Sequence, residues 1–308
     1  MSRGVDKLAA VARLPEAAVV AAAVVTQLGD VWFLFGLLGL IYWFGEALPA
    51  GLAFDRRRAA FLVALGLGAN VVTTTLKGWL AYPRPPGAGT AGGGDLLPAL
   101  VEPLYASAAT ATGFGFPSGH ALGTTMVYGG LALLVGTRRA YASAAAVVGV
   151  VALSRVVLGV HYLVDIVAGV AVGVAVLAAL YRLCGRGSNP GRALLLVALA
   201  ALLAPVVGGY NFETMAALGG ALGARIAWGV VGGAVAHEST TRLGGVVSAA
   251  VGVVFGGLFG VVYAVEPAPY VVFVAVGLVL AGVLAAPLAG EAVARRTRAS
   301  GTGGAVRP

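Results

Sequence analysis

The sequence predicts an all-α fold, a polytopic integral membrane helix bundle with about nine transmembrane helices. Of its 308 residues, 59% are hydrophobic and only 10% are charged. Several apolar runs reach about 18 residues or more, the length that crosses about 30 Å of hydrocarbon. Gly, Pro or Arg bounds these runs, and the glycines within them are compatible with close packing of membrane helices. These observations favour a membrane protein over a soluble one.

The expected helices follow the apolar runs in chain order. Residues 15–27 favour an interfacial helix that leads into the first span. Spans are expected near residues 28–45, 59–78, 118–136, 140–158, 161–184, 191–208, 213–235, 243–265 and 269–290. We expect two parts, a core of five membrane helices in residues 1–187 and a C-terminal extension of about four helices with a short polar tail in residues 188–308.

Arginine clusters predict the orientation of the bundle in the membrane, because Lys and Arg are retained in short cytoplasmic loops. The clusters on one side of the predicted topology contain Arg56, Arg57, Arg58, Arg138, Arg139, Arg182, Arg186, Arg192, Arg242, Arg295, Arg296 and Arg298. We expect this side and the C-terminus in the cytoplasm, in a protein of the cell membrane. The long Gly/Ala/Pro loop at residues 86–115 and the N-terminus are then outside, although Arg3, Lys7 and Arg13 fit this rule poorly.

Charge and cysteine content exclude some classes of protein. The formal net charge is +8, but the cations occur in short loops between apolar runs, so we expect no binding of nucleic acid. Cys184 is the single cysteine, which excludes an internal disulfide and a cysteine metal cluster. The N-terminal region lacks a clear small-residue cleavage site, and we expect no removable signal peptide.

Three motifs place titratable residues at the predicted helix ends. They read KGWLAYPRP, FPSGH and SRVVLGVHYLVD, at residues 77–85, 116–120 and 154–165. The ends of the second to fifth spans carry, in order, Lys77, Ser118, Arg155 and His161. The topology therefore brings all three motifs to the face opposite the arginine clusters. Charged groups near a bilayer core are costly, so this convergence predicts a functional site.

The cations of the motifs suit a phosphate group. Pro83 and Pro85 force the backbone around Arg84 out of a helix, which lets its guanidinium turn back toward Lys77. With Arg155, these two residues form a predicted cradle of three cations. The arginines suit bidentate contacts to phosphate oxygens, and the lysine acts as a point charge.

The other motif residues supply an anion-binding helix start and two histidines. Ser118 is predicted to cap a helix whose first amides, at Gly119 and His120, favour a phosphate. His161 and Asp165 are four residues apart and are expected on one helix face, so the carboxylate can hold one imidazole nitrogen while the other attacks phosphorus. His120 remains as the acid for the leaving alkoxide.

The motifs K-x6-RP, PSGH and SR-x3-G-x-H-x3-D, in this order, resemble those of the type 2 phosphatidic acid phosphatase (lipid phosphate phosphatase) family, which shares its site with vanadium haloperoxidases. The resemblance covers about residues 28–185. It implies a phosphohistidine intermediate without a metal or another cofactor, with His161 as nucleophile, Asp165 as its partner and His120 as acid. By the same resemblance, phosphate is bound by Lys77, Arg84, Ser118, Gly119 and Arg155.

The predicted function is therefore that of a metal-independent membrane hydrolase of lipid phosphates or diphosphates. Residues 1–187 form its predicted lipid phosphatase core, with the site at the non-cytoplasmic face. A headgroup at the interface can reach the cations while its chain stays among the helices. A polyprenyl diphosphate, phosphatidic acid and phosphatidylglycerol phosphate all remain open as substrates. The predicted partners are this substrate and membrane lipids, and a homo-oligomer stays open.

Two alternatives remain. A phosphotransferase would resolve the phosphohistidine with an acceptor alcohol instead of water. A non-enzymatic lipid-phosphate transporter would only bind substrate at this site, with the C-terminal helices as part of a pathway. Haloperoxidase activity is disfavoured, because a site facing lipid suits phosphate esters better.

Three charged or titratable residues fall outside the motifs. Arg225 lies within a predicted span, where a cation normally has a partner or a function, and an ion pair with Glu213 is one candidate. His237 is expected in a solvated loop and receives no role. Asp30 is expected to cap the first span or to lie at its outer surface.

Overall fold

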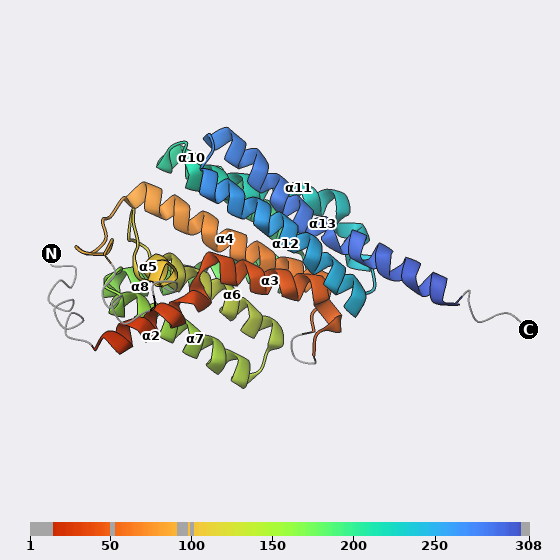
Figure 1. The fold of residues 1–308 in the computed structure, drawn as a ribbon, viewed down its shortest axis with the longest axis horizontal. Helices are drawn as coiled ribbons and strands as arrows, with labels where there is room; N and C mark the ends of the chain where they lie inside the picture. The colour runs from red at the N-terminus through yellow and green to blue at the C-terminus, as the bar shows by residue number, and fades with distance from the viewer. Residues whose placement is uncertain (1–14, 50–52, 91–97, 99–101, 303–308) are drawn as a thin grey trace, which may run out of the picture. The chain divides into compact units, whose positions relative to one another are not determined.

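The structure, a computed structural model, describes residues 15–49, 53–90, 98 and 102–302. These residues form α-helices and two short 3-10 helices, with one isolated bridge between Pro83 and Phe114 as their only β pairing. In chain order (Figure 1) they are α2 (Glu16–Thr26), η1 (Gln27–Gly29), α3 (Val31–Phe44), η2 (Gly45–Ala47), α4 (Arg56–Leu80), α5 (Glu102–Ala109), α6 (Gly119–Val135), α7 (Arg138–Val157), α8 (Leu163–Leu183), α9 (Pro190–Ala201), α10 (Leu203–Gly208), α11 (Phe212–His237), α12 (Arg242–Val265) and α13 (Pro269–Thr302). The all-α prediction is confirmed for this part of the chain.

Every predicted span has a helical counterpart in the described residues, although not every counterpart is long enough to cross a membrane by itself. Among the described residues, seven helices are long and apolar enough to cross a membrane, or eight if the bent pair at residues 16–29 and 31–47 is one span. Asp30 has an extended backbone at this 43° bend. The predicted third span is the shorter α6, because Ser118 caps its start and Gly136 ends it in the left-handed conformation.

The structure confirms one predicted span with a local break and corrects one predicted loop. The span predicted at 191–208 is present as Pro190–Gly208, and its helix is broken at Leu202, three residues before Pro205, which lacks the N–H that would bond the Ala201 carbonyl. The predicted loop at 86–115 contains a helix, α5, that the sequence did not indicate. Residues 1–14, including the predicted external N-terminus, and most of residues 91–101 lie outside the described part.

The chain forms two compact units that interleave along the sequence. The first contains Met1–Leu34 and Val72–Tyr181, and the second contains Phe35–Val71 and Arg182–Pro308. All three motifs fall within the first unit. The predicted functional division at residues 1–187 and 188–308 stays a prediction, since compactness does not report which part carries an activity.

Small residues allow close helix packing in the first unit. A Cβ atom added at Gly169 of α8 would lie 2.6 Å from the carbonyl oxygen of Ser118, and one at Gly173 would lie 2.9 Å from Cβ of Thr125. The start of α8 therefore lies directly against the start of α6. On another side of this unit, α2 packs against α7 and α5. Figure 1 shows α2 beside α7.

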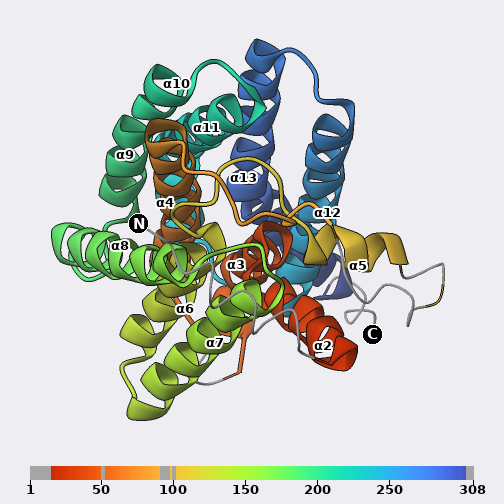
Figure 2. The ribbon, with the colours of Figure 1, turned by 90° about the vertical axis from the view of Figure 1, so that its left-hand side faces the viewer.

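The second unit is built around the first half of α4 and a glycine-mediated helix pair. Ala59, Ala60, Phe61 and Leu62 of α4 are completely buried. The helices α11 and α13 lie side by side (Figure 2). A Cβ atom at Gly223 would lie 2.3 Å from the carbonyl oxygen of Gly277, so only glycine permits this backbone approach.

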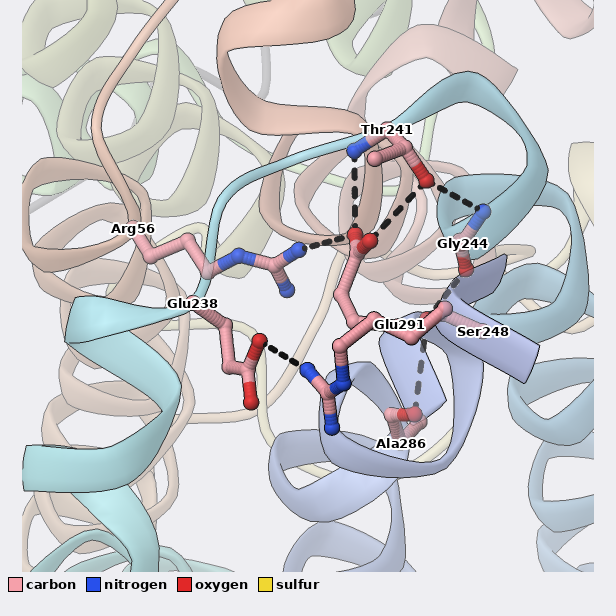
Figure 3. A network of polar contacts seen from close by, with 8 residues as sticks. Arg56, Glu238, Thr241, Gly244, Ser248, Ala286 and Glu291 are labelled. Carbon is pink, nitrogen blue, oxygen red and sulfur yellow. Dashed lines mark hydrogen bonds and ion pairs between the residues drawn. The ribbon is translucent and has the colours of Figure 1, made fainter. Parts of the chain in front are cut away.

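A buried ion pair joins three helices of the second unit (Figure 3). Nη2 of Arg56, at the start of α4, lies 2.8 Å from Oε1 of Glu291 on α13, and both side chains are 2% exposed. The backbone N–H of Thr241 donates to Oε1 at 3.0 Å, and its hydroxyl donates to Oε2 at 2.9 Å. The same hydroxyl accepts from the N–H of Gly244 and thereby caps α12. Arg295 and Glu238 form a second ion pair in this unit.

The suggested pair of Arg225 with Glu213 does not form. Both residues lie on α11, twelve positions apart, which corresponds to about 18 Å along a straight helix. Glu213 is exposed near the start of that helix, and Arg225 is partly buried in its middle. Within the described part of the chain, Arg225 makes no ion pair and its Nε atom is buried without a hydrogen bond.

Candidate active site

A helix cap holds the predicted His161–Asp165 pair together. Asp165 is the third residue of α8, and its Oδ2 atom accepts a hydrogen bond from the N–H of Tyr162 at 3.0 Å. The carbonyl oxygen of Tyr162 accepts from the N–H of Asp165 at 3.0 Å. This is a capping arrangement, in which a side chain at the third helical position bonds the amide that precedes the helix. Nδ1 of His161 lies 3.3 Å from the same Oδ2 atom.

The pair differs in one respect from the sequence-based prediction. His161 and Asp165 were expected on one face of a single helix, but His161 lies in the turn before α8 begins at Leu163. The residues meet because Asp165 folds back over the helix start to cap Tyr162. Both side chains are buried, with exposures of 2% and 0%.

The partners of the imidazole determine which nitrogen carries the proton. Nη1 of Arg84 lies 3.0 Å from Nε2 of His161. A guanidinium can only donate a hydrogen bond and an ionised carboxylate can only accept one. Nε2 therefore carries the lone pair, and Nδ1 carries the proton that it donates to Asp165. This is the tautomer in which Nε2 is available as a nucleophile.

A short paired segment positions Arg84. The bridge between Pro83 and Phe114 is extended by a hydrogen bond from the N–H of Gly115 to the carbonyl oxygen of Tyr82 at 2.8 Å. The guanidinium of Arg84 then donates through Nε to the carbonyl oxygen of Thr112 at 2.8 Å. As expected, the backbone around Arg84 between the two prolines lies outside a helix, and the Arg84 side chain reaches His161.

Gly115 allows this segment to pass between the site residues. A Cβ atom there would lie 3.2 Å from Cγ of Arg84 and 3.4 Å from Oδ2 of Asp165. A larger residue would press on both side chains. Nη1 of Arg84 also donates to the carbonyl oxygen of Val160 at 3.1 Å, which ties it to the turn that carries His161.

Arg155 lies in the last turn of α7 and is 4% exposed. Its Nη1 atom donates to Oγ1 of Thr26 at 2.9 Å and to the carbonyl oxygen of Ala108 at 3.2 Å. Its Nε atom is buried, and no described residue bonds it. The guanidinium is therefore fixed by neutral acceptors and keeps a donor that an incoming anion can use.

The start of α6 lies beside the capped start of α8. Ser118 is completely buried, its Oγ atom accepts a hydrogen bond from the N–H of Ala121 at 3.4 Å, and its own N–H donates to the carbonyl oxygen of Asp165 at 3.0 Å. The predicted helix cap is confirmed. Gly119 opens the helix where a Cβ atom would lie 3.0 Å from Cγ2 of Thr73, so the helix start has little room for a side chain.

His120 and Lys77 complete the group. The Nε2 atom of His120 is buried and has no hydrogen-bond partner in the described residues. His120 interacts electrostatically with Arg155, His161, Lys77 and Arg84. Lys77 is in the last turn of α4 and is half-buried. The structure thus brings the eight predicted site residues together in the first unit.

Burial lowers the pKa of His161 from its ordinary value of 6.5 to about 4. The hydrogen bond with Asp165 acts in the opposite direction, whereas nearby positive charges lower the pKa further, in the order Arg84, Arg155 and Lys77. The imidazole is therefore neutral at pH 7, with its Nε2 lone pair present.

The sequence did not indicate the groups that orient the two arginines. They are the hydroxyl of Thr26 and the carbonyl oxygens of Ala108, Thr112 and Val160. A carbonyl oxygen belongs to every residue type and leaves no signal in a sequence. Thr26 precedes the motifs by about fifty residues within an apolar run. Among the described residues, no group of three or more His, Cys, Asp or Glu side chains could hold a metal ion.

Comparison with known proteins places these observations in a family. The sequence profile of the PAP2 superfamily matches residues 58–187. Two curated relatives, both named decaprenylphosphoryl-5-phosphoribose phosphatase, come from Mycobacterium tuberculosis strains CDC 1551 / Oshkosh and ATCC 25618 / H37Rv. Each is 34% identical over 139 residues, which is 44% of this chain and 68% of the relative. No solved structure matches the chain significantly.

Proposed function

The chain belongs to the PAP2 superfamily, and from this premise we propose that it hydrolyses the terminal phosphate of a lipid phosphate or polyprenyl diphosphate through a phosphohistidine on His161. Its apolar helices and its family make it a membrane phosphatase. The observation that carries the proposal is the imidazole of His161, held by Asp165 at Nδ1 and facing Arg84 at Nε2. This geometry supports an oriented nucleophile beside a cation.

In the first step, the substrate phosphate replaces Nε2 of His161 as an acceptor of the Arg84 N–H groups. The Nε2 lone pair attacks phosphorus and the bond from phosphorus to the leaving oxygen breaks. His120 donates its proton to that oxygen, and Asp165 stabilises the positive charge that develops at Nδ1. The dianionic substrate favours the protonated form of His120 among these cations.

In the second step, water attacks the phosphohistidine. Neutral His120 accepts a proton from the water, the bond between nitrogen and phosphorus breaks, and the electron pair returns to Nε2. Inorganic phosphate leaves and both histidines return to their starting states. Lys77, Arg84 and Arg155, with the start of α6 at Ser118 and Gly119, stabilise the charge on the phosphate oxygens. No step requires a metal ion.

Several finer points belong to this proposal. The relatives carry a name that specifies a decaprenyl-linked phosphate, so we place polyprenyl-linked phosphates first among the substrates, before phosphatidic acid and phosphatidylglycerol phosphate. The arginines at the start of α4 and Lys77 at its end support a site on the non-cytoplasmic face of the cell membrane, with the C-terminus in the cytoplasm. A homo-oligomer is compatible with the proposal.

The test is phosphate release in EDTA by detergent-purified protein, from a panel of polyprenyl phosphates and diphosphates and glycerolipid phosphates. His161→Ala should lower turnover by about 10⁴-fold or more, because it removes the nucleophile. His237→Ala is the matched control, since His237 is at the exposed end of α11. A rapid alkaline quench with ³²P-labelled substrate should recover an acid-labile phosphoenzyme in the parent and none in the alanine variant.

The same assay separates the alternatives. A phosphorylated lipid alcohol, formed when prenol or diacylglycerol is added, would indicate transfer to an acceptor. Turnover that survives in His161→Ala would contradict the phosphohistidine, and absence of turnover with every substrate would favour the transporter hypothesis.

A further inference from the structure

We infer that Thr26, outside the region that matches the family, is a positioning residue for the reaction, because its hydroxyl orients the guanidinium of Arg155 toward the phosphate. This inference rests on the proposed function. Thr26 ends α2, 129 positions before Arg155, and is completely buried. Its Oγ1 atom accepts from Nη1 of Arg155 at 2.9 Å.

A second acceptor fixes the same nitrogen. The carbonyl oxygen of Ala108, near the end of α5, lies 3.2 Å from Nη1 of Arg155. Two acceptors on one nitrogen define the direction of a planar guanidinium more tightly than one does, because its donors form a rigid fork. With Nη1 occupied, the buried and unpartnered Nε atom is available to a ligand.

Apolar packing holds both acceptors in place. Ala23 of α2 forms a buried cluster with Tyr105, Ala108 and Ala109 of α5, and Leu158, which follows α7, packs against it. The cluster therefore joins the three elements that carry Thr26, Ala108 and Arg155. The hydroxyl of Thr26 has a fixed position relative to the arginine.

The neutrality of both acceptors matters for the chemistry. A carboxylate in the place of Thr26 would orient Arg155 equally well but would cancel the charge that a phosphate needs. A hydroxyl and a carbonyl orient the guanidinium without neutralising it. Its full positive charge can then stabilise the negative charge on the phosphate oxygens in the transition state. Asp30 interacts electrostatically with Arg155, but it forms no ion pair with it.

The segment after α5 supports the same interpretation. Four residues beyond Ala108, the carbonyl oxygen of Thr112 accepts from Nε of Arg84 at 2.8 Å. One stretch of backbone thus orients both predicted phosphate-binding arginines. Thr26 adds a side-chain contact to Arg155 that a substitution can remove while the backbone acceptors stay in place.

The experiment compares Thr26→Val with Thr26→Ser in detergent-purified, full-length protein. Valine keeps the shape and removes the hydroxyl, so kcat should fall by about tenfold with KM little changed, as expected when a group acts mainly in the transition state. Serine keeps the hydroxyl and should restore most of kcat. Thr125→Val is the matched control, because in the described part of the chain the buried hydroxyl of Thr125 bonds only the Ala121 carbonyl of its own helix.

Two further measurements distinguish positioning from a structural effect. In an Arg155→Lys background, Thr26→Val should have little additional effect, because the contact is already lost. Orthovanadate, a mimic of five-coordinate phosphorus, should bind Thr26→Val about tenfold more weakly by calorimetry, in the same ratio as kcat/KM falls.

Each outcome bears on the inference separately from the proposed function. Equal kcat in the parent and Thr26→Val, an equal loss in the Arg155→Lys background, or unchanged vanadate affinity would overturn the role of Thr26 while phosphatase activity stands. A parent without turnover would contradict the proposed function, and the vanadate comparison would still decide whether Thr26 orients an anion-binding Arg155.

Discussion

Two buried arginines, one in each compact unit, show how differently this chain uses the same side chain. Arg155 in the first unit is 4% exposed and Arg56 in the second is 3% exposed. Arg56 meets the carboxylate of Glu291 at 2.8 Å, which two further donors from Thr241 also contact (Figure 3). Arg155 meets a hydroxyl and a backbone carbonyl, which carry no charge.

The difference follows from what a buried charge needs. Removing an ion from water has an effective penalty of several kcal/mol, and an opposite charge in good geometry offsets it. Arg56 has such a partner within its unit, so its charge is balanced in the resting protein, although its Nε and Nη1 atoms have no hydrogen-bond partner in the described residues. Arg155 lacks an acid at ion-pair distance among the described residues, so its charge is best satisfied when an anion binds. The comparison supports a structural role for Arg56 and is consistent with the proposed phosphate-binding role of Arg155.

Between the two arginines, the larger effect on activity is expected from replacing Arg155. Arg155→Met should lower kcat/KM by about 10³-fold or more, the scale of losing a preorganised donor at a charged transition state. Its thermal midpoint in detergent should stay the same or rise, because a buried charge is removed without leaving another one behind. Arg139→Met, at the exposed start of α7, is the control. A large loss of stability with normal activity in the folded fraction would reverse the roles assigned to the two arginines.

The second prediction removes the arginine that has an acid. Arg56→Met should lower the free energy of unfolding by about 3–5 kcal/mol, because it leaves the buried carboxylate of Glu291 without its cation. Activity per folded molecule should be unchanged. The double variant Arg56→Met with Glu291→Met should recover most of the stability, as measured by reversible denaturation in mixed micelles. Equal losses of stability in the single and double variants would show that stability depends on the ion pair itself and not on the unpaired carboxylate that remains in the single variant.

These two arginines also show what the sequence could and could not predict. Arg155 was assigned to the phosphate site because it belongs to a motif with fixed spacing at a helix end. The cap at Ser118, set by local sequence, was predicted correctly. Arg56 was interpreted only as part of a cytoplasmic cluster, since its partner Glu291 lies 235 positions away and no local pattern connects them. The helix α5 was missed because its short Ala-containing segment follows a long Gly-rich stretch.

The bounds of the helices, and with them the position of His161, depend on individual local contacts that the apolar pattern does not show. The boundary of α8 is set by the contact between Asp165 and the Tyr162 amide, which moves His161 out of the helix without separating it from Asp165. Likewise, an extended Asp30 bends the predicted first span. Apolar runs predict that a helix exists, but such single contacts decide where it begins, bends and ends.

The smallest predicted effect is on the pH dependence of kcat/KM, which reflects the positive charge around His161 in the first unit. Since burial and the neighbouring cations lower the pKa of His161 to about 4, its neutral form is present above that pH and is lost as pH falls through it. An ordinary histidine with a pKa of 6.5 would already be about three-quarters protonated at pH 6. His161 should therefore cause no loss of kcat/KM between pH 7 and pH 6. The second ionisation of a phosphate monoester also falls near pH 6, so the group itself must be observed.

Carbon-detected NMR of histidine-labelled protein provides that observation, with the signals assigned by His161→Asn and His237→Asn. The His161 resonance should not titrate between pH 7 and pH 5.5. Replacing Arg155 by Met should raise the pKa of His161, because one of the positive charges that disfavour the imidazolium is removed. Replacing Arg56 by Met should not. Two results would contradict the prediction that unbalanced positive charge lowers the pKa of His161. One is an equal response to both substitutions. The other is a His161 resonance that titrates near 6.5 in the parent.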